Sequence, residues 1–245
     1  MINLIITKDK ISAIKKASLI IIDQLKTKPN SSICLASGST MLPLYKLLIK
    51  LNKKNKVDFS LASFFNLDEY IGLPKKNKNL YQNWLRENFL NHINTKEENL
   101  IFLDPFSKNI SKMCRDYEEV MNKKKIDLQL LGLGLNCHIG FNEPPTSLDS
   151  RTRRVELSEA TRNYNSKFFS SKSKVPTHAI TLGIKTILKS KKIILLSIDA
   201  KKAIPTTKTL EEKIDPNFPS TYLRKHRNVD FIIDKKAASL LTGPK

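Results

Sequence analysis

The chain has 245 residues, of which 43 are Lys or Arg and 23 are Asp or Glu, so its formal net charge at pH 7 is +20. This length suits one large domain or two small ones, and a hydrophobic content of 40% is typical of soluble globular proteins. No uncharged apolar run approaches the about 20 residues that a helix needs to cross a bilayer, which excludes a transmembrane protein. Residues 1–8 lack the features of a secretory signal, so we expect a cytoplasmic protein.

The positive charge is scattered along the chain and is carried mostly by lysine. Proteins that read nucleic-acid bases depend chiefly on arginine. We therefore expect a solvated lysine-rich surface and no specific nucleic-acid partner. The three cysteines, Cys34, Cys114 and Cys137, are widely spaced without a CxxC pair, so we expect reduced thiols and neither disulfides nor a zinc cluster.

Short apolar runs alternate with segments of helical period along the whole chain. The predicted strands are residues 3–7, 31–36, 59–66, 126–132, 178–182, 192–197 and 229–234. The predicted helices are residues 11–25, 40–52, 81–92, 110–122, 159–169 and 235–241. Such alternation is typical of a parallel sheet flanked by helices. We predict a single α/β domain over residues 1–245, with one doubly wound, mostly parallel, Rossmann-like sheet that binds ligands at the carboxyl ends of its strands.

Residues 35–40, with the sequence LASGST, lie between a predicted strand and a predicted helix. The small residues Ser37, Gly38 and Ser39 allow backbone N–H groups to approach an anion, and the helix amino terminus adds about half a positive charge. The segment matches neither the Walker pattern nor the dinucleotide fingerprint. Two interpretations stay open: a phosphate cradle, or a tight turn in which Thr40 caps the helix.

The segment FFNLDEYIGLP at residues 64–74 brings Asp68 and Glu69 to the exit of a predicted strand. A carboxylate at the ligand-binding end of a strand is a candidate general base. The alternative interpretation is an exposed turn or a helix cap.

The most specific stretch is residues 130–153, LLGLGLNCHIGFNEPPTSLDSRTR. It brings His138 close to Asn136 and Glu143, either of which can hold the imidazole in one tautomer. The alternative is a structural histidine. Neighbouring side chains of an extended backbone point to opposite sides, which disfavours a nucleophile built from Cys137 and His138. No recognised spacing of ligands indicates a metal site.

The motifs LASGST, NLDEYIGLP, GLNCHIGFNEP, SRTR and NSKFF stand in the order and spacing of the glucosamine-6-phosphate deaminases. The chain resembles that family over essentially its whole length. The related 6-phosphogluconolactonases share the fold and the Gly-His loop, but FNEP favours the deaminase branch. The resemblance implies a hydrolase of amino-sugar catabolism that converts glucosamine 6-phosphate and water to fructose 6-phosphate and ammonia, without a metal or organic cofactor.

The resemblance also implies roles for individual residues. His138 opens the pyranose ring by proton transfer, while Asn136 and Glu143 orient and tune it. Asp68 moves a proton from C2 to C1 of the open sugar. The 6-phosphate is held by Ser37, Gly38, Ser39 and Thr40, with Lys167 and Lys202 as cationic partners.

Four residues depart from the family pattern. Asn136 stands where many members have Asp, and Cys137 and Asp199 stand where Gly is usual. If its position needs a positive φ, Cys137 is strained by about 1 kcal/mol or more. Lys167 replaces an Arg, so we expect weaker phosphate orientation. We also expect Asp199 to neutralise part of the charge of Lys202.

Two further enzyme questions stay open at the level of sequence. Val155 stands where activated family members usually have Lys, so we expect no activation by N-acetylglucosamine 6-phosphate, and a monomer is favoured over a homo-oligomer. The expected substrate is glucosamine 6-phosphate, and the alternative is a deaminase or isomerase for another hexosamine phosphate such as the galactosamine epimer, because spacing does not distinguish the two epimers. The alternative of another class is a sugar-phosphate-binding protein with weakened catalysis, although retention of Asp68 and Glu143 favours an enzyme.

Overall fold

The computed structural model describes residues 2–243. Seven strands form its main sheet: β1 (Ile2–Thr7), β2 (Ser32–Leu35), β3 (Ser63–Asn66), β5 (Leu100–Ile101), β6 (Leu128–Gly132), β9 (Lys192–Ser197) and β10 (Val229–Asp234). Their order across the sheet is β1-β10-β9-β6-β2-β3-β5, and every pairing is parallel. The predicted α/β architecture with a parallel sheet is confirmed.

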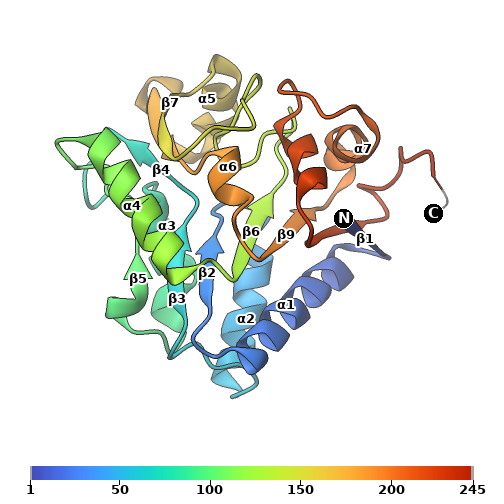
Figure 1. Ribbon diagram of the computed structural model, residues 1–245, viewed down its shortest axis with the longest axis horizontal. Helices are drawn as coiled ribbons and strands as arrows, with labels where there is room; N and C mark the ends of the chain where they lie inside the picture. The colour runs from blue at the N-terminus through green and yellow to red at the C-terminus, as the bar shows by residue number, and fades with distance from the viewer. Residues whose placement is uncertain (1, 244–245) are drawn as a thin grey trace.

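Helices connect the strands and flank the sheet (Figure 1). The α-helices are α1 (Lys10–Thr27), α2 (Leu42–Lys53), α3 (Tyr81–Asn88), α4 (Ile110–Lys124), α5 (Glu159–Asn165), α6 (Ile184–Ile187) and α7 (Ala203–Glu211). The 3-10 helices are η1 (Leu90–His92), η2 (Glu97–Asn99), η3 (Ser166–Phe168), η4 (Lys172–Lys174), η5 (Ala200–Lys202) and η6 (Pro219–Lys225). No helix of residues 2–243 has both the length and the apolar character that crossing a bilayer requires.

Helix α1 shows how the sequence builds these elements. Asp9 precedes the helix and accepts a hydrogen bond from the N–H of Ser12 at 2.8 Å, which satisfies one of the donors left free at a helix start. Ile14, Ile21 and Leu25 recur at helical spacing and are buried in the core. Each such side chain contributes about 1.5–3 kcal/mol by leaving water.

The path of the chain through the sheet reverses between β2 and β6, which pair with each other. From β2 the path leads through β3 to β5, and from β6 it leads the other way through β9 to β10. The loops after β2 and β6 therefore diverge and leave a crevice at the carboxyl edge of the sheet, where open α/β sheets bind ligands. At the far edge, β1 pairs with β10, with Ile2 opposite Val229.

A second, antiparallel sheet lies at the carboxyl edge of the main sheet. It consists of β4 (Asp68–Ile71), β8 (His178–Thr181) and β7 (Arg153–Glu156), in the order β4-β8-β7. Strand β3 leads into β4 through the buried Leu67. The N–H of Leu67 donates to the carbonyl of Leu35 at 3.0 Å, and its own carbonyl accepts from the N–H of Leu182 at 3.0 Å. This one residue is therefore bonded to the main sheet on one side and reaches the end of β8 on the other.

The small sheet accounts for several differences from the predicted elements, and β5, α6 and α7 were not predicted either. The predicted strand at residues 178–182 belongs to it and not to the parallel sheet, and its partners β4 and β7 were not predicted. The prediction of a single sheet is to this extent wrong. Three of the four residues of β7, RRVE, are charged, and the strand is too short to give a strand signal.

Two other predicted boundaries are wrong. Residues 59–62 form a turn before β3, and residues 235–240 form turns where a helix was predicted. In the second segment the buried Asp234 accepts from the N–H of Ala237 at 2.8 Å, and the N–H of Ala238 bonds the Asp234 carbonyl at 3.0 Å. These bonds close one turn, and so short a segment does not offset the cost of nucleating a helix.

We expect Asp127→Asn to lower the free energy of unfolding at pH 7 by about 2 kcal/mol. Asp127 is 2% exposed and accepts hydrogen bonds from Lys28 and Lys191 at 2.7 and 2.8 Å and from the N–H of Ser32 at 3.0 Å. Burial raises the pKa of this carboxyl, but the bonds from Lys191, Lys28 and Ser32 outweigh it and lower the pKa overall.

A lowered pKa gives a contribution that is complete above the unfolded value of about 3.9 and is lost as the pH falls through the folded value. Urea denaturation of both proteins should therefore show a difference at pH 7 that shrinks below about pH 4. Equal stability at pH 7 would contradict a structural role for the Asp127 charge.

Candidate active site

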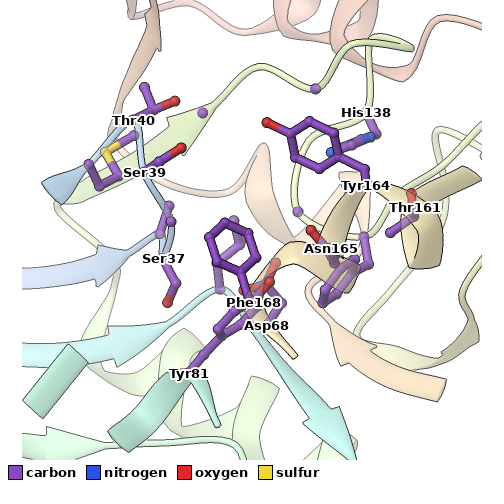
Figure 2. Close-up of a pocket in the computed structure, with 18 of the residues that line it drawn as sticks. Ser37, Ser39, Thr40, Asp68, Tyr81, His138, Thr161, Tyr164, Asn165 and Phe168 are labelled. Carbon is purple, nitrogen blue, oxygen red and sulfur yellow. The ribbon is translucent and has the colours of Figure 1, made fainter. Parts of the chain in front are cut away.

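A pocket of about 520 Å³ opens at the reversal point of the sheet. Its walls come from the loop after β2, the start of β4, the loop after β6, helices α5 and η3, and the end of η5. Figure 2 shows Ser37, Ser39 and Thr40 on one side and His138, Tyr164 and Thr161 on the other. Eight of the predicted site residues line it: Ser37, Gly38, Ser39, Thr40, Asp68, Asn136, His138 and Lys202.

The loop after β2 is built to leave its polar groups unused by the protein. Gly38 has φ +110°, and its carbonyl accepts from the N–H groups of Met41 and Leu42 at 3.1 and 3.2 Å. The residue before α2 is Met41, which makes no side-chain cap, so the interpretation of Thr40 as the cap is wrong. The buried hydroxyl of Ser37 has no hydrogen-bond partner among the described residues. This hydroxyl is therefore free to bond a ligand or a water molecule in the pocket.

Asp68 is the first residue of β4 and is 7% exposed, with its side chain in the pocket (Figure 2). The buried side chain of Asn66 donates to the Asp68 carbonyl at 3.0 Å, which fixes the backbone there. Burial raises the pKa of the Asp68 carboxyl well above its usual value, and the neighbouring Glu69 raises it further. Asp68 is thus a stronger base than a carboxylate in water.

His138 lies in the tight loop after β6, where the N–H of Gly134 donates to the His138 carbonyl at 2.9 Å. The side-chain oxygen of Asn136 lies 2.5 Å from Nδ1 of His138 and also accepts the backbone N–H of His138 at 3.3 Å. Since this amide oxygen only accepts, Nδ1 carries the proton and Nε2 keeps its lone pair. The prediction that Asn136 holds the imidazole in one tautomer agrees with this geometry.

Burial lowers the pKa of His138 to about 4, with Glu143 raising it and Lys202 lowering it. The imidazole is therefore neutral near pH 7 and acts through Nε2 as a proton acceptor. Gly134 makes its position possible, because a Cβ on Gly134 would lie 2.4 Å from three atoms of the ring.

Glu143 makes no hydrogen bond to the imidazole of His138, a contact that the sequence allowed. Its carboxylate accepts from the N–H and the hydroxyl of Ser158 at 2.9 and 3.0 Å, and from the hydroxyl of Thr161. Ser158 precedes α5 and also caps it, so the carboxylate lies at the amino end of that helix. Glu143 acts on His138 only through its charge.

The two predicted phosphate lysines differ in position. Lys202 is buried beside the pocket, and its ammonium donates to the carbonyl of Leu133. Burial lowers the pKa of Lys202 to about 8, and the charges of Lys201 and Lys167 lower it further. Lys167 does not line the pocket, because its ammonium lies over the rings of Tyr164 and Phe168, 3.7 and 5.0 Å from their centres.

Two of the departures from the family pattern lie at backbone positions that favour glycine. Cys137 has φ +65°, so the strain expected for a residue with a Cβ at this position applies. Asp199 has φ +79° and ψ 152°, a region that almost only glycine adopts. The carboxylate of Asp199 lies 3.7 Å from the ammonium of Lys10. Its charge also acts on Lys202 in the expected direction, because it raises the pKa of Lys202 against the larger lowering by burial, Lys201 and Lys167.

Sequence reasoning missed the aromatic wall of the pocket. Tyr81 and Phe141 stack with their centres 5.9 Å apart, and Tyr70 lies against both. Asn165 donates to the Tyr70 hydroxyl at 2.9 Å and joins α5 to β4. These residues come from four separate segments of the chain, so no local pattern connects them. Their only signal is the gathering of aromatic residues in the flanking motifs.

Within residues 2–243 no group of three or more His, Cys, Asp and Glu side chains is arranged to hold a metal ion. The site thus consists of a loop with free polar groups, a buried carboxylate and a neutral imidazole, at the reversal point of a doubly wound sheet. Residues 11–232 match the profile of the glucosamine-6-phosphate isomerases/6-phosphogluconolactonase family, and the chain belongs to that family.

Within the family, the chain is most similar to proteins of one activity. It is 48% identical over 235 residues to a glucosamine-6-phosphate deaminase of Clostridium novyi (strain NT), covering 96% of this chain and 98% of that protein. It is 44% identical over 240 residues to a glucosamine-6-phosphate deaminase of Thermoanaerobacter sp. (strain X514), covering 98% and 95%.

Solved structures agree with these similarities. A monomeric glucosamine-6-phosphate deaminase superposes with a TM-score of 0.94 at 38% identity, covering 97% of this chain and 99% of that one. A 6-phosphogluconolactonase from Trypanosoma brucei superposes with a TM-score of 0.75 at 20% identity, covering 99% of each chain, which shows a shared fold.

We expect Gly134→Ala to displace the His138 ring towards solvent and to raise its pKa from about 4 towards the usual value of about 6.5. The cause is the overlap of the new methyl group with the ring. Titration of the imidazole by NMR measures this pKa. Gly132→Ala is the matched control, because its Cβ meets only the end of Met41 at 3.8 Å. A Gly134→Ala protein whose His138 still titrates near pH 4 would contradict the packing argument.

Proposed function

We propose that this protein is a glucosamine-6-phosphate deaminase that converts glucosamine 6-phosphate and water to fructose 6-phosphate and ammonia. The observation that carries the proposal is the combination of three features in one pocket: a loop of small polar residues with an unpaired hydroxyl, a buried carboxylate and a neutral imidazole. The deaminases to which the chain is similar over nearly its full length support the same activity.

The 6-phosphate binds at the loop after β2. Its oxygens accept from the hydroxyls of Ser37, Ser39 and Thr40 and from backbone N–H groups around Gly38, at the amino end of α2. The ammonium of Lys202 supplies the positive charge. Lys167 joins it only if its side chain leaves the aromatic rings that now hold it, so we assign Lys167 a secondary part.

Ring opening falls to His138. Its unprotonated Nε2 takes the proton from the hydroxyl at C1, and the resulting imidazolium gives a proton to the ring oxygen as the C1–O5 bond breaks. Asn136 holds Nδ1 and keeps Nε2 directed into the pocket. The negative charge of Glu143 stabilises the imidazolium while it exists, since opposite charges favour the ionised form.

Asp68 then takes the proton from C2 of the open chain and gives it back at C1. As the C2 proton leaves, the aldehyde oxygen at C1 gains a proton from solvent, which makes an enolamine. Protonation at C1 then gives an iminium at C2, which becomes the imine when it loses a proton to solvent. Water adds to this imine and ammonia leaves, which gives the ketone of fructose 6-phosphate. C1 and C2 are neighbours, so one carboxylate on one face of the planar enolamine reaches both. We propose that these side chains suffice without a metal or organic cofactor.

The proposed enzyme acts as a monomer in the cytoplasm. The monomeric deaminase that superposes at a TM-score of 0.94 supports the first statement. The three cysteines, all buried and unpaired, agree with a reducing compartment. Light scattering coupled to gel filtration measures the mass in solution, and a dimer or hexamer would contradict the proposed monomer.

The test of the activity is to incubate the purified protein with glucosamine 6-phosphate and a chelator, and to measure fructose 6-phosphate and ammonia together. We expect equimolar products, and a loss of at least about 1,000-fold in kcat for Asp68→Asn, because an amide cannot accept the C2 proton. Galactosamine 6-phosphate serves as the comparison substrate. Binding of either sugar phosphate without turnover would favour the weakened binding protein instead.

Phosphate binding should weaken as the pH rises above about 8, the pKa of Lys202. Below that pH the ammonium is charged, and above it the charge is lost. Fructose 6-phosphate is the suitable probe because it carries no amine that titrates in this range. Calorimetry from pH 6.5 to 9.5 should show this loss of affinity, and Lys202→Arg should remove most of it because arginine stays charged. An affinity that is flat across pH 8 in the wild type would contradict the role of Lys202.

A further inference from the structure

Glu69 is a carboxylate near the pocket that the proposed mechanism leaves unused. It follows Asp68 in β4, and neighbouring side chains in a strand point to opposite faces. Asp68 faces the pocket, whereas Glu69 is 0% exposed and points into the protein. A fully buried acidic side chain is rare and needs a specific compensation.

The compensation comes from backbone N–H groups. One oxygen of the Glu69 carboxylate accepts from the N–H of Tyr70 at 2.8 Å and from that of Tyr81 at 2.7 Å. The other oxygen accepts from the N–H of Gln82 at 2.8 Å. Tyr81 and Gln82 begin α3, so the carboxylate occupies the positive end of that helix and fastens it to β4.

We propose that Glu69 is a positioning residue for the proposed deamination, which holds Asp68 against the aromatic wall and strengthens it as a base through its buried negative charge. The proposal rests on the deaminase function argued above. The geometric part of the proposal follows from Tyr81. The N–H of Tyr81 donates to Glu69, while its side chain lines the pocket and stacks on Phe141 in the loop of His138. Glu69 thus connects the base, the helix start and the wall.

The electrostatic part follows from the burial of both carboxyl groups. Like charges in a low-dielectric interior oppose each other's ionisation. Burial raises the pKa of Glu69 to about 7, while the three N–H groups lower it. For Asp68, burial is the larger cause of the raised pKa and Glu69 is the second. The charge of Glu69 therefore helps to set the pKa of Asp68, and with it the acid limb of the pH profile.

The decisive variant is Glu69→Gln, which keeps the length of the side chain and one oxygen for Tyr70 and Tyr81. We expect the acid limb of kcat/KM to move to lower pH by about one unit, as when a nearby like charge is removed. On the plateau, kcat should fall about threefold to tenfold because Asp68 is a weaker base. KM for the sugar phosphate should change less than about twofold, since the phosphate site is untouched.

Glu118→Gln is the matched control. Glu118 is 7% exposed, accepts from the N–H of Thr152 at 2.7 Å and from the hydroxyl of Thr186, and does not line the pocket. Its loss should lower stability while the acid limb stays in place. Equal movement of the limb in both variants, or no movement in a folded Glu69→Gln enzyme, would overturn the electrostatic part of the proposal.

Glu69→Asp separates position from charge and serves also if Glu69→Gln does not fold. It keeps the charge but is one methylene too short to reach Tyr81 and Gln82 as Glu69 does. We expect an acid limb close to that of the wild type and a lower kcat. An unchanged kcat would overturn the positioning part.

The failure of the inference can be told apart from the failure of the proposed function. If the wild type does not deaminate glucosamine 6-phosphate, the function is wrong. The carboxyl carbon of Asp68, labelled with carbon-13, can then still be titrated by NMR in the wild type and in Glu69→Gln. A titration midpoint that does not fall in the variant refutes the inference without any turnover.

Discussion

The hydrogen bonds of Leu67 are the constraint on which the site depends. The residue is bonded to Leu35 at the end of β2 and to Leu182 beyond the end of β8. The main sheet and the small sheet are thereby joined within one residue of Asp68. If the chain left β3 in any other direction, the carboxylate would not stand opposite the loops after β2 and β6, and those loops would enclose no reactive group. The side chain of Leu67 is itself buried, so water does not compete for these bonds.

One physical cause, removal from water, shifts the pKa of Asp68, His138 and Lys202 in the pocket. Burial raises the pKa of Asp68 and lowers those of His138 and Lys202. The direction differs because desolvation disfavours whichever form is charged. Burial therefore makes Asp68 a stronger base once it is ionised, and it keeps the imidazole of His138 unprotonated near neutral pH. Neither property requires a special side chain, only walls that keep solvent out, and the aromatic residues of α3, α5 and η3 provide them.

The sequence predicted the elements and loops that are continuous in the chain, but not the contacts between segments far apart in the sequence. Strands β9 and β10 were predicted to the residue, because buried parallel strands are near-continuous apolar runs. The loops after β2 and β6 were found because glycine and polar residues cluster there. The small sheet was not, since its strands are short and β4 pairs with β8 across more than 100 residues, as Asp68 does with Thr181. Spacing also could not show that Glu143 accepts hydrogen bonds from Ser158 and Thr161, because only the folded chain brings these residues together.

The pairing of β1 with β10 has a consequence for the time at which the sheet can be completed. Ile2 lies opposite Val229, so among the strands of this sheet the one synthesised first is the neighbour of the one synthesised last. Until β10 is synthesised, the backbone N–H and C=O groups of β1 lack their partner strand, whereas β2 and β3 can already pair with each other. Closing so long a loop is slow, because the chain must give up its conformational freedom before the two strands can bond to each other. Strand β1 is thus the last strand to pair with the sheet. A nascent chain interrupted before β10 would leave the edge of β9 without a partner strand.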